Sequence, residues 1–166
     1  NAALGTAIGT LTSTDIDGDT NFTYTLLNDA GGVFSLNGDQ LIVNAALDYE
    51  TLSSYTITIQ TDDNNGGVYQ KDFTININDV NENPTNINLT NNNIGENATV
   101  GTSIGTLTST DPDGDTNFTY TLLNDAGGVF SINGDQLKVN AALDYETQNS
   151  YTITIQTDDN NGGVYQ

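Results

Sequence analysis

The chain consists of two copies of one sequence. Residues 1–70 align without a gap with residues 97–166 at a constant offset of 96, and eight of the 70 aligned pairs differ, which leaves 62 identical. A period of 96 residues suits one small domain with its own core and exceeds the repeats of about 20–45 residues that stack into solenoids. We therefore predict two tandem domains of one fold. A complete repeat would run from about Pro84 to beyond Gln166, as in a window on a longer array.

Short stretches of alternating apolar and polar residues run through each copy. Phe118, Tyr120 and Leu122 alternate with threonines, which is the period of a strand with one buried face. Asn133-Gly134 lies between two apolar stretches and signals a tight hairpin. The expected strands cover residues 87–89, 102–108, 118–122, 129–132, 137–139 and 151–157 of the second copy and 73–77 of the first. About seven strands per repeat without a helix predict an all-β, immunoglobulin-like Greek-key sandwich.

The charge of the chain restricts its partners. The net charge is −20, and the only cationic residues are Lys71 and Lys138, so the chain is not expected to bind nucleic acid or an anionic membrane surface. Cysteine and histidine are absent, which leaves hard cations as the expected metals. No apolar run approaches the roughly 20 residues of a membrane span. The many Thr, Asn, Asp and Gly residues are typical of an extracellular, cell-surface or secreted β array.

Carboxylates recur in each copy away from the strand centres, and more lie between the copies. The stretch Asp79-Val80-Asn81-Glu82-Asn83-Pro84 carries two carboxylates and two carboxamides within five residues and ends at a proline. A linker whose only role is flexibility would be rich in Gly and Ser. Calcium takes about 6–8 oxygen ligands and mixes carboxylates, amides and carbonyls. We interpret this linker (80–84, between repeat 1 at 1–79 and repeat 2 at 85–166) as a calcium-binding joint.

The order of these motifs resembles the cadherin repeat, particularly its bacterial tandem-array form. The matching motifs are Gly95-Glu96-Asn97, Asp111-Pro112-Asp113, Leu143-Asp144-Tyr145-Glu146, Thr157-Asp158 and the linker. The resemblance covers essentially the whole chain, and the order and spacing of the five motifs carry it. It implies that repeat 1 lacks its first strand in this sequence and that repeat 2 lacks its last.

The resemblance also implies that Ca²⁺ binds where successive domains meet. The implied ligands of the complete joint are Asp48, Glu50, Asp79, Asn81, Glu82, Asn83, Asp111, Asp113, Asp158 and the backbone carbonyl of Asn117. The implied half-sites are Asp15, Asp17 and Asp62 in repeat 1 and Glu96, Asp144 and Glu146 in repeat 2. Glu82 departs from the pattern, since the family usually has Asp there. The upstream counterpart of Glu96 would lie before Asn1.

Other interpretations of the carboxylates are weaker. The stretch that begins at Asp111 opens like an EF-hand loop, but Thr116 and Leu122 occupy the positions that require Gly and Glu. Two carboxylates suffice for glycoside hydrolysis. These carboxylates, however, are expected at sandwich ends without another reactive side chain, so we predict that the chain is not an enzyme. The remaining aspartates, Asp19, Asp29, Asp39, Asp63, Asp72 and their copies, are interpreted as solvated turn residues.

The expected function is mechanical. Calcium at each joint would fix the angle between repeats and produce a stiff extracellular rod, such as the spacer of a bacterial surface adhesin. The alternative is a self-associating filament subunit or homophilic adhesion module, in which open sheet edges exchange strands between chains. The expected partners are adjacent repeats of the same chain, and like chains or a cell surface.

Overall fold

The computed structural model describes residues 2–166, and the chain divides into unit 1, which ends at Val80, and unit 2, which begins at Asn81. Only strands, turns and loops occur among the described residues, so the predicted all-β class is confirmed. The Asn81–Pro84 stretch of the predicted linker belongs to unit 2.

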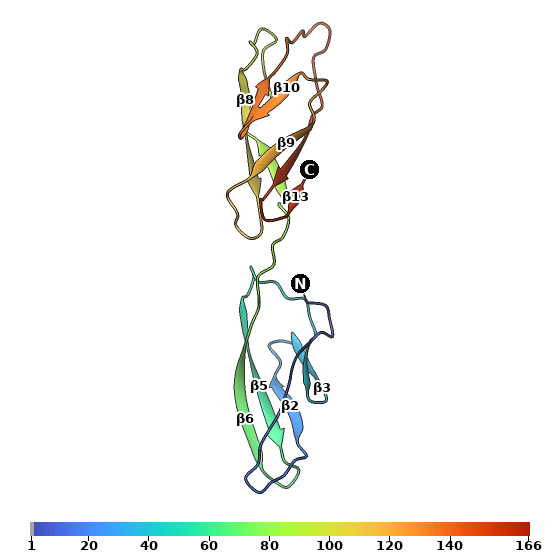
Figure 1. The fold of residues 1–166 in the computed structure, drawn as a ribbon, viewed down its shortest axis with the longest axis vertical. Helices are drawn as coiled ribbons and strands as arrows, with labels where there is room; N and C mark the ends of the chain where they lie inside the picture. Colours follow the sequence, from blue (N-terminus) through green and yellow to red (C-terminus); the bar gives the residue numbers. More distant parts are fainter. Residues whose placement is uncertain (1) are drawn as a thin grey trace. The chain divides into compact units, whose positions relative to one another are not determined.

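Unit 1 is a sandwich of two three-stranded antiparallel sheets (Figure 1). Its strands are β1 (Ala7–Thr10), β2 (Thr23–Asn28), β3 (Phe34–Asn37), β4 (Gln40–Val43), β5 (Ser54–Asp62) and β6 (Val68–Asn76). One sheet has the order β1-β4-β3 and the other β2-β5-β6. Phe34 and Leu41 from the first sheet meet Ile57 and Ile59 from the second to form the buried core. The Tyr55 ring packs edge-on against Phe34, with centroids 5.5 Å apart.

Unit 2 has the same two-sheet architecture with one additional strand at its start and different strand lengths. Its strands are β7 (Asn86–Leu89), β8 (Ser103–Thr110), β9 (Thr119–Asn124), β10 (Phe130–Asn133), β11 (Gln136–Val139), β12 (Thr154–Asp158) and β13 (Val164–Tyr165). The sheets have the orders β10-β11-β8-β7 and β13-β12-β9. Ile104, Phe130, Leu137 and Val139 form its buried core.

Two details of the expected strands differ in the structure. The Asn133-Gly134 hairpin forms as predicted, with Asn133 opposite Gln136 and Gly134 at φ +63°. The stretch predicted as a strand at 151–157, however, becomes one only from Thr154. The stretch predicted at 73–77 is part of a longer strand that begins at Val68. A strand requires a hydrogen-bonded neighbour, and β13 pairs with only the last two residues of β12.

Gly105 shows how closely β7 packs on β8. A Cβ atom at Gly105 would lie 2.5 Å from the Asn91 carbonyl oxygen and 2.9 Å from Leu89 Cδ1, whereas one at the equivalent Gly9 would meet no atom within 4 Å. We expect Gly105→Ala to lower the free energy of unfolding by about 1–3 kcal/mol through overpacking. The matched Gly9→Ala should cost little or stabilise β1 slightly, because alanine restricts the unfolded chain. Urea unfolding of both variants measures the difference, and equal losses would contradict this interpretation of the packing.

Candidate metal centre

Three carboxylates of unit 2 meet at one end of its sandwich. Asp111, Asp115 and Asp159 each offer an oxygen, and these oxygens lie within 4.8 Å of one another. Asp111 and Asp115 come from the loop between β8 and β9, and Asp159 directly follows β12. Thr157 is fully buried and Asp159 is 2% exposed. Because side chains two apart on a strand share a face, Asp159 points inward as Thr157 does.

The turn after β12 holds Asp159 in place. The backbone N–H groups of Asn161 and Gly163 donate to Asp159 Oδ1 at 2.7 Å and 2.9 Å. The Asn161 side-chain amide donates to Asp115 Oδ2 at 2.8 Å and thereby ties the turn to the β8–β9 loop. A Cβ atom on Gly163 would collide with the Asp159 carboxylate and lie 2.8 Å from the Glu82 carbonyl oxygen, so the turn requires glycine there. Local sequence therefore positions this buried carboxylate.

The linker residues of unit 2 rest on these carboxylates. The Asn81 side-chain amide donates to Asp159 Oδ2 at 2.9 Å, and the Glu82 backbone N–H donates to Asp113 Oδ2 at 2.8 Å. Asp113 in turn donates its backbone N–H to Asp111 Oδ1 at 2.9 Å. Asp113 is half-buried, whereas its copy Asp17 in unit 1 is exposed. The linker thus covers the carboxylates and removes them from water.

This burial leaves negative charge without full compensation. Asp111 Oδ2 and Asp113 Oδ1 are buried oxygens without a hydrogen-bond partner among the described residues. Burial raises the pKa of Asp111 above its usual value, and repulsion from Asp113, Asp115 and Asp159 adds to the rise. Unmatched buried carboxylate oxygens are costly. A hard cation with oxygen ligands would satisfy them, so the donor set fits calcium.

At Asp159, hydrogen bonds to the carboxylate outweigh the effect of burial and favour the charged form. Burial would raise its pKa, but the hydrogen bonds from the Asn81 side chain and from the backbone N–H groups of Asn161 and Gly163 outweigh burial, so that its pKa lies below the usual value. Neither lysine serves as a counter-ion in the part of the chain that the structure describes. Lys71 lies over the Phe73 ring at 5.1 Å on β6, and Lys138 lies on β11.

Unit 1 repeats the arrangement in a more open form. Asp15, Asp19 and Asp63 bring carboxylate oxygens within 4.8 Å of one another. The Asn65 side-chain amide donates to Asp19 Oδ2 at 3.0 Å, as Asn161 does to Asp115. Backbone N–H groups of Asn65 and Gly67 lower the pKa of Asp63. Asp63 is only half-buried, in contrast to its copy Asp159.

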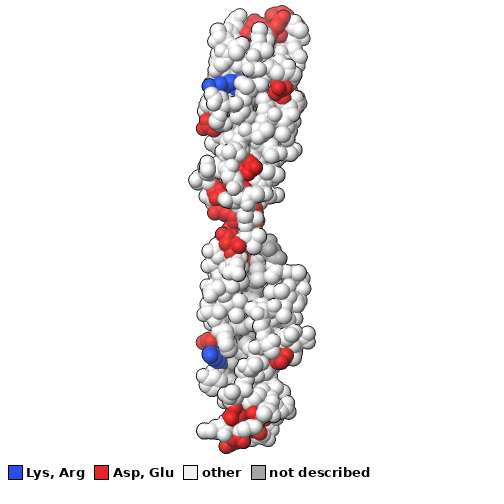
Figure 2. Space-filling model, in the orientation of Figure 1, with Lys and Arg blue, Asp and Glu red and all other residues white. Residues whose placement is uncertain are grey.

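Exposed acidic groups lie elsewhere in each unit. Glu96, Asp144 and Glu146 bring oxygens within 4.8 Å of one another, and the Tyr145 backbone N–H donates to Glu96 Oε2 at 2.9 Å. The Thr147 hydroxyl donates to Asp144 at 2.8 Å and lowers its pKa. On the face shown in Figure 2, the acidic side chains of each unit gather mainly near its ends. Glu96, Asp144 and Glu146 are the three residues that the resemblance implies as a half-site in repeat 2.

Within unit 1, two further predicted ligands lie close together. Glu50 and Asp79 are both exposed, and each offers a carboxylate oxygen within 4.8 Å of the other. Asp48 lies two residues before Glu50. The Thr51 hydroxyl donates to Asp48 Oδ2 at 2.8 Å, and this hydrogen bond lowers the pKa of Asp48.

Several predicted ligands lie outside these groups. Asp158 Oδ1 accepts from the Asn160 backbone N–H at 2.7 Å, and its copy Asp62 accepts from Asn64 at 2.8 Å. The carbonyl oxygen of Asn117 accepts from the Asn160 side chain at 2.8 Å. Asn83 is exposed. The carboxylates that do join the groups, although sequence reasoning treated them as turn residues, are Asp19, Asp63, Asp115 and Asp159.

Comparison with known proteins identifies the class. The chain matches the cadherin domain family over residues 1–78 and 90–166, so it belongs to the cadherin family. It is 32% identical to mouse protocadherin Fat 4 (98% of this chain, 4% of that protein) and 31% identical to bovine cadherin-18 (92% of this chain, 22% of that protein). It therefore spans less than a quarter of the length of these relatives.

Solved structures show the same fold. A crystal structure of human protocadherin-24 EC1-2 matches with a TM-score of 0.74 and 22% identity, over 93% of this chain and 78% of that one. Mouse cadherin-23 EC22-24 matches with a TM-score of 0.71 and 25% identity, over 99% of this chain and 58% of that one. The predicted cadherin-like sandwich is thus confirmed. Among the described residues, no helix is long and apolar enough to cross a membrane.

Proposed function

We propose that this chain is part of a calcium-stabilised extracellular adhesion array, in which calcium at the linker stiffens successive cadherin repeats into a spacer such as that of a bacterial surface adhesin. The observation that carries the proposal is the docking of Asn81 and Glu82 on the buried carboxylates of unit 2. The linker docks beside the buried oxygens Asp111 Oδ2 and Asp113 Oδ1, which have no hydrogen-bond partner among the described residues, and a cation that binds these oxygens would also order the linker. Membership of the cadherin family, whose domains bind calcium, supports this choice of ion.

The proposed ligands come from both sides of the linker. Asp111, Asp113, Asp115 and Asp159 with Asn81 and Glu82 form the unit 2 part, and Asp48, Glu50 and Asp79 are the unit 1 contribution. Without calcium, mutual repulsion of these carboxylates would loosen the linker. With calcium bound, each of these carboxylates would be attracted to the cation, and this attraction would offset their mutual repulsion. This chemistry is structural, and the proposal assigns the chain no enzymatic reaction.

Thermal unfolding with and without calcium tests the proposal. We expect the melting temperature of the full chain to rise by many degrees in millimolar calcium relative to excess chelator, because a ligand present at a hundred times its Kd stabilises the folded state by about 2.7 kcal/mol. Magnesium at the same concentration is the control, since its small octahedral shell fits such a site poorly. X-ray scattering of the same samples should show a stiffer particle in calcium. An unchanged melting temperature would mean that the carboxylates only solubilise the protein.

Homophilic association is the second candidate. β6 is an edge strand of its sheet, and Val68 and Tyr69 on it are 60% and 66% exposed. Exposed apolar residues at a sheet edge favour contact with another chain. Among the matched structures, one of protocadherin gammaB7 EC3-6 is described as a cis-dimer. Sedimentation at two protein concentrations separates this candidate from a passive spacer.

A further inference from the structure

The two copies contain four Asn-Gly pairs in two kinds of place. The hairpin pairs, Asn37-Gly38 and Asn133-Gly134, lie where β3 meets β4 and where β10 meets β11. The turn pairs, Asn65-Gly66 and Asn161-Gly162, lie in the turns after β5 and β12. Glycine has no side chain to shield its backbone nitrogen, so this nitrogen can attack the side-chain amide carbon of the preceding asparagine. The surroundings of each pair decide whether the reaction can occur.

The hairpin pairs are held by neighbouring strands. Asn133 belongs to β10 and lies opposite Gln136, and the carbonyl oxygen of Asp135 in the turn accepts from the backbone N–H of buried Leu107 at 2.8 Å. Unit 1 repeats both contacts. Ring closure requires the asparagine backbone to leave the extended conformation of a strand. The hairpin would therefore have to detach from β8 before its asparagine could react.

The turn pairs lie outside the strands and are held more weakly. Asn161 is exposed, Gly162 has φ +113°, and a Cβ atom at Gly162 would meet no described atom within 4 Å. One exposed hydrogen bond, from the Asn161 side-chain amide to Asp115 Oδ2 at 2.8 Å, restrains the reacting group. Asn65 is exposed in the same way and donates to Asp19 at 3.0 Å. Release of one exposed side chain requires less local opening than separation of a hairpin from its sheet.

We propose that Asn65 and Asn161 are sites of spontaneous deamidation, whereas the asparagines of the hairpin pairs are protected. The Gly162 backbone nitrogen attacks Cγ of Asn161. An N–Cγ bond forms, the Cγ–Nδ2 bond breaks, and the side-chain NH₂ leaves as ammonia with the proton of Gly162. Water then opens the resulting succinimide, at the main-chain carbonyl to give isoaspartate or at the side-chain carbonyl to give aspartate. The reaction consumes a water molecule, releases ammonia and requires no other reagent.

Either product would disrupt the contact between the turn and the carboxylates. Deamidation replaces the amide that donates to Asp115 by a second carboxylate, and two like charges at that distance repel. Isoaspartate also lengthens the backbone by one carbon between the N–H groups of Asn161 and Gly163, which together hold Asp159. Asn65 and Asn161 are not among the proposed calcium ligands, so the inference does not rest on calcium binding.

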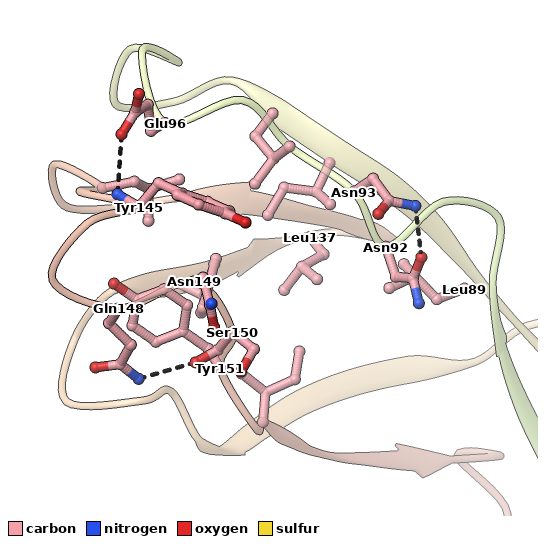
Figure 3. A pocket seen from close by; sticks show the side chains of 15 residues that line it. Leu89, Asn92, Asn93, Glu96, Leu137, Tyr145, Gln148, Asn149, Ser150 and Tyr151 are labelled. Carbon is pink, nitrogen blue, oxygen red and sulfur yellow. Dashed lines mark hydrogen bonds between the residues drawn. The ribbon is translucent and has the colours of Figure 1, made fainter.

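Peptide mapping by mass spectrometry tests where the chain reacts. The full chain is incubated at mildly alkaline pH in excess chelator, after circular dichroism has confirmed that it is folded there, and a second sample is incubated in urea. Each kind of pair has one copy in each unit, so fragments of the two units need not be separated. Asn92 and Asn93, which hydrogen-bond to each other at 3.0 Å in an exposed loop, serve as a reference because neither precedes glycine (Figure 3).

We expect the turn pairs of the folded chain to deamidate at least about tenfold faster than the hairpin pairs, which corresponds to about 1.4 kcal/mol less free energy of local opening. In urea the four pairs should react at similar rates, because the protection of the hairpins is lost. Equal rates for both kinds of pair in the folded chain, or faster reaction of the hairpin pairs, would overturn the proposal.

A pair of double variants tests the consequence of the reaction. Asn65→Asp with Asn161→Asp copies the aspartate product, and Asn37→Asp with Asn133→Asp makes the same change of charge in the hairpins. In excess chelator we expect the turn variant to melt lower than the hairpin variant by at least about 4–8 °C, the shift that a modest loss produces in a domain of this size. Equal melting of the two variants would overturn the assigned consequence. Failure of the calcium experiments would leave both measurements unchanged.

Discussion

Replacement of Asp159 by asparagine is expected to weaken calcium binding by unit 2 by at least about tenfold, which corresponds to about 1.4 kcal/mol. Asp159 is buried and shares its site with Asp111 and Asp115, so the variant removes one charge from the centre of the ligand set. Asp158→Asn is the matched control, because it removes the same charge one residue away. Asp158 bonds to the Asn160 backbone and lies outside the group. We expect this control to bind calcium almost as the parent does.

Without calcium, we expect Asp159→Asn to have no destabilising effect. In chelator, Asp159→Asn relieves the repulsion that contributes to the raised pKa of Asp111, so the variant should be at least as stable as the parent. Calorimetric titration measures the affinity, and thermal unfolding in chelator measures the stability. A loss of stability in chelator that equals the loss in calcium would indicate a packing role for Asp159. Equal effects of the two variants on affinity would remove Asp159 from the proposed site.

Phe34→Ala is expected to lower the free energy of unfolding of unit 1 by about 3–5 kcal/mol. Phe34 is 1% exposed, and its ring meets Tyr55 edge-on between the two sheets. The equivalent Phe130→Ala should cost less, because Phe130 is 8% exposed and borders an open pocket of unit 2. Truncation beside an existing cavity removes fewer contacts. Thermal unfolding of both variants in chelator measures the two losses, and a larger loss for Phe130→Ala would contradict the difference in core packing.

Sequence pattern predicted the fold well because most of the signal is local. The alternation at Tyr120 and Leu122 and the turn at Asn133-Gly134 each specify an element without reference to the rest of the chain. Asp159 was missed although its signal was present. The alternation that places Ile153, Ile155 and Thr157 inward continues by one step to Asp159, but the prediction stopped at the adjacent Asp158. The prediction did not apply the rule that alternate residues along a strand share a face, which selects Asp159 over Asp158.

Other features depend on neighbours that local pattern does not contain. Residues 55–61 and 151–157 have identical sequences. The first stretch lies wholly within β5, whereas the second becomes a strand only from Thr154, because β6 runs the length of β5 and β13 is short. Asp115 joins Asp111 through the path of the β8–β9 loop and the amide of Asn161. Loop paths of this kind are set by tertiary contacts, and sequence reasoning accordingly treated Asp115 as a turn residue.

The turn between β12 and β13 joins two roles in one short segment. It closes the hairpin, and its backbone N–H groups at Asn161 and Gly163 hold the buried carboxylate of Asp159. A cation bound to Asp159 would have to leave before this hairpin could open. Because that contact belongs to the native state, its main effect would be on the rate of unfolding and little on the rate of folding. Resistance to proteases would then depend on how long the ion stays bound, as a matter of kinetic stability.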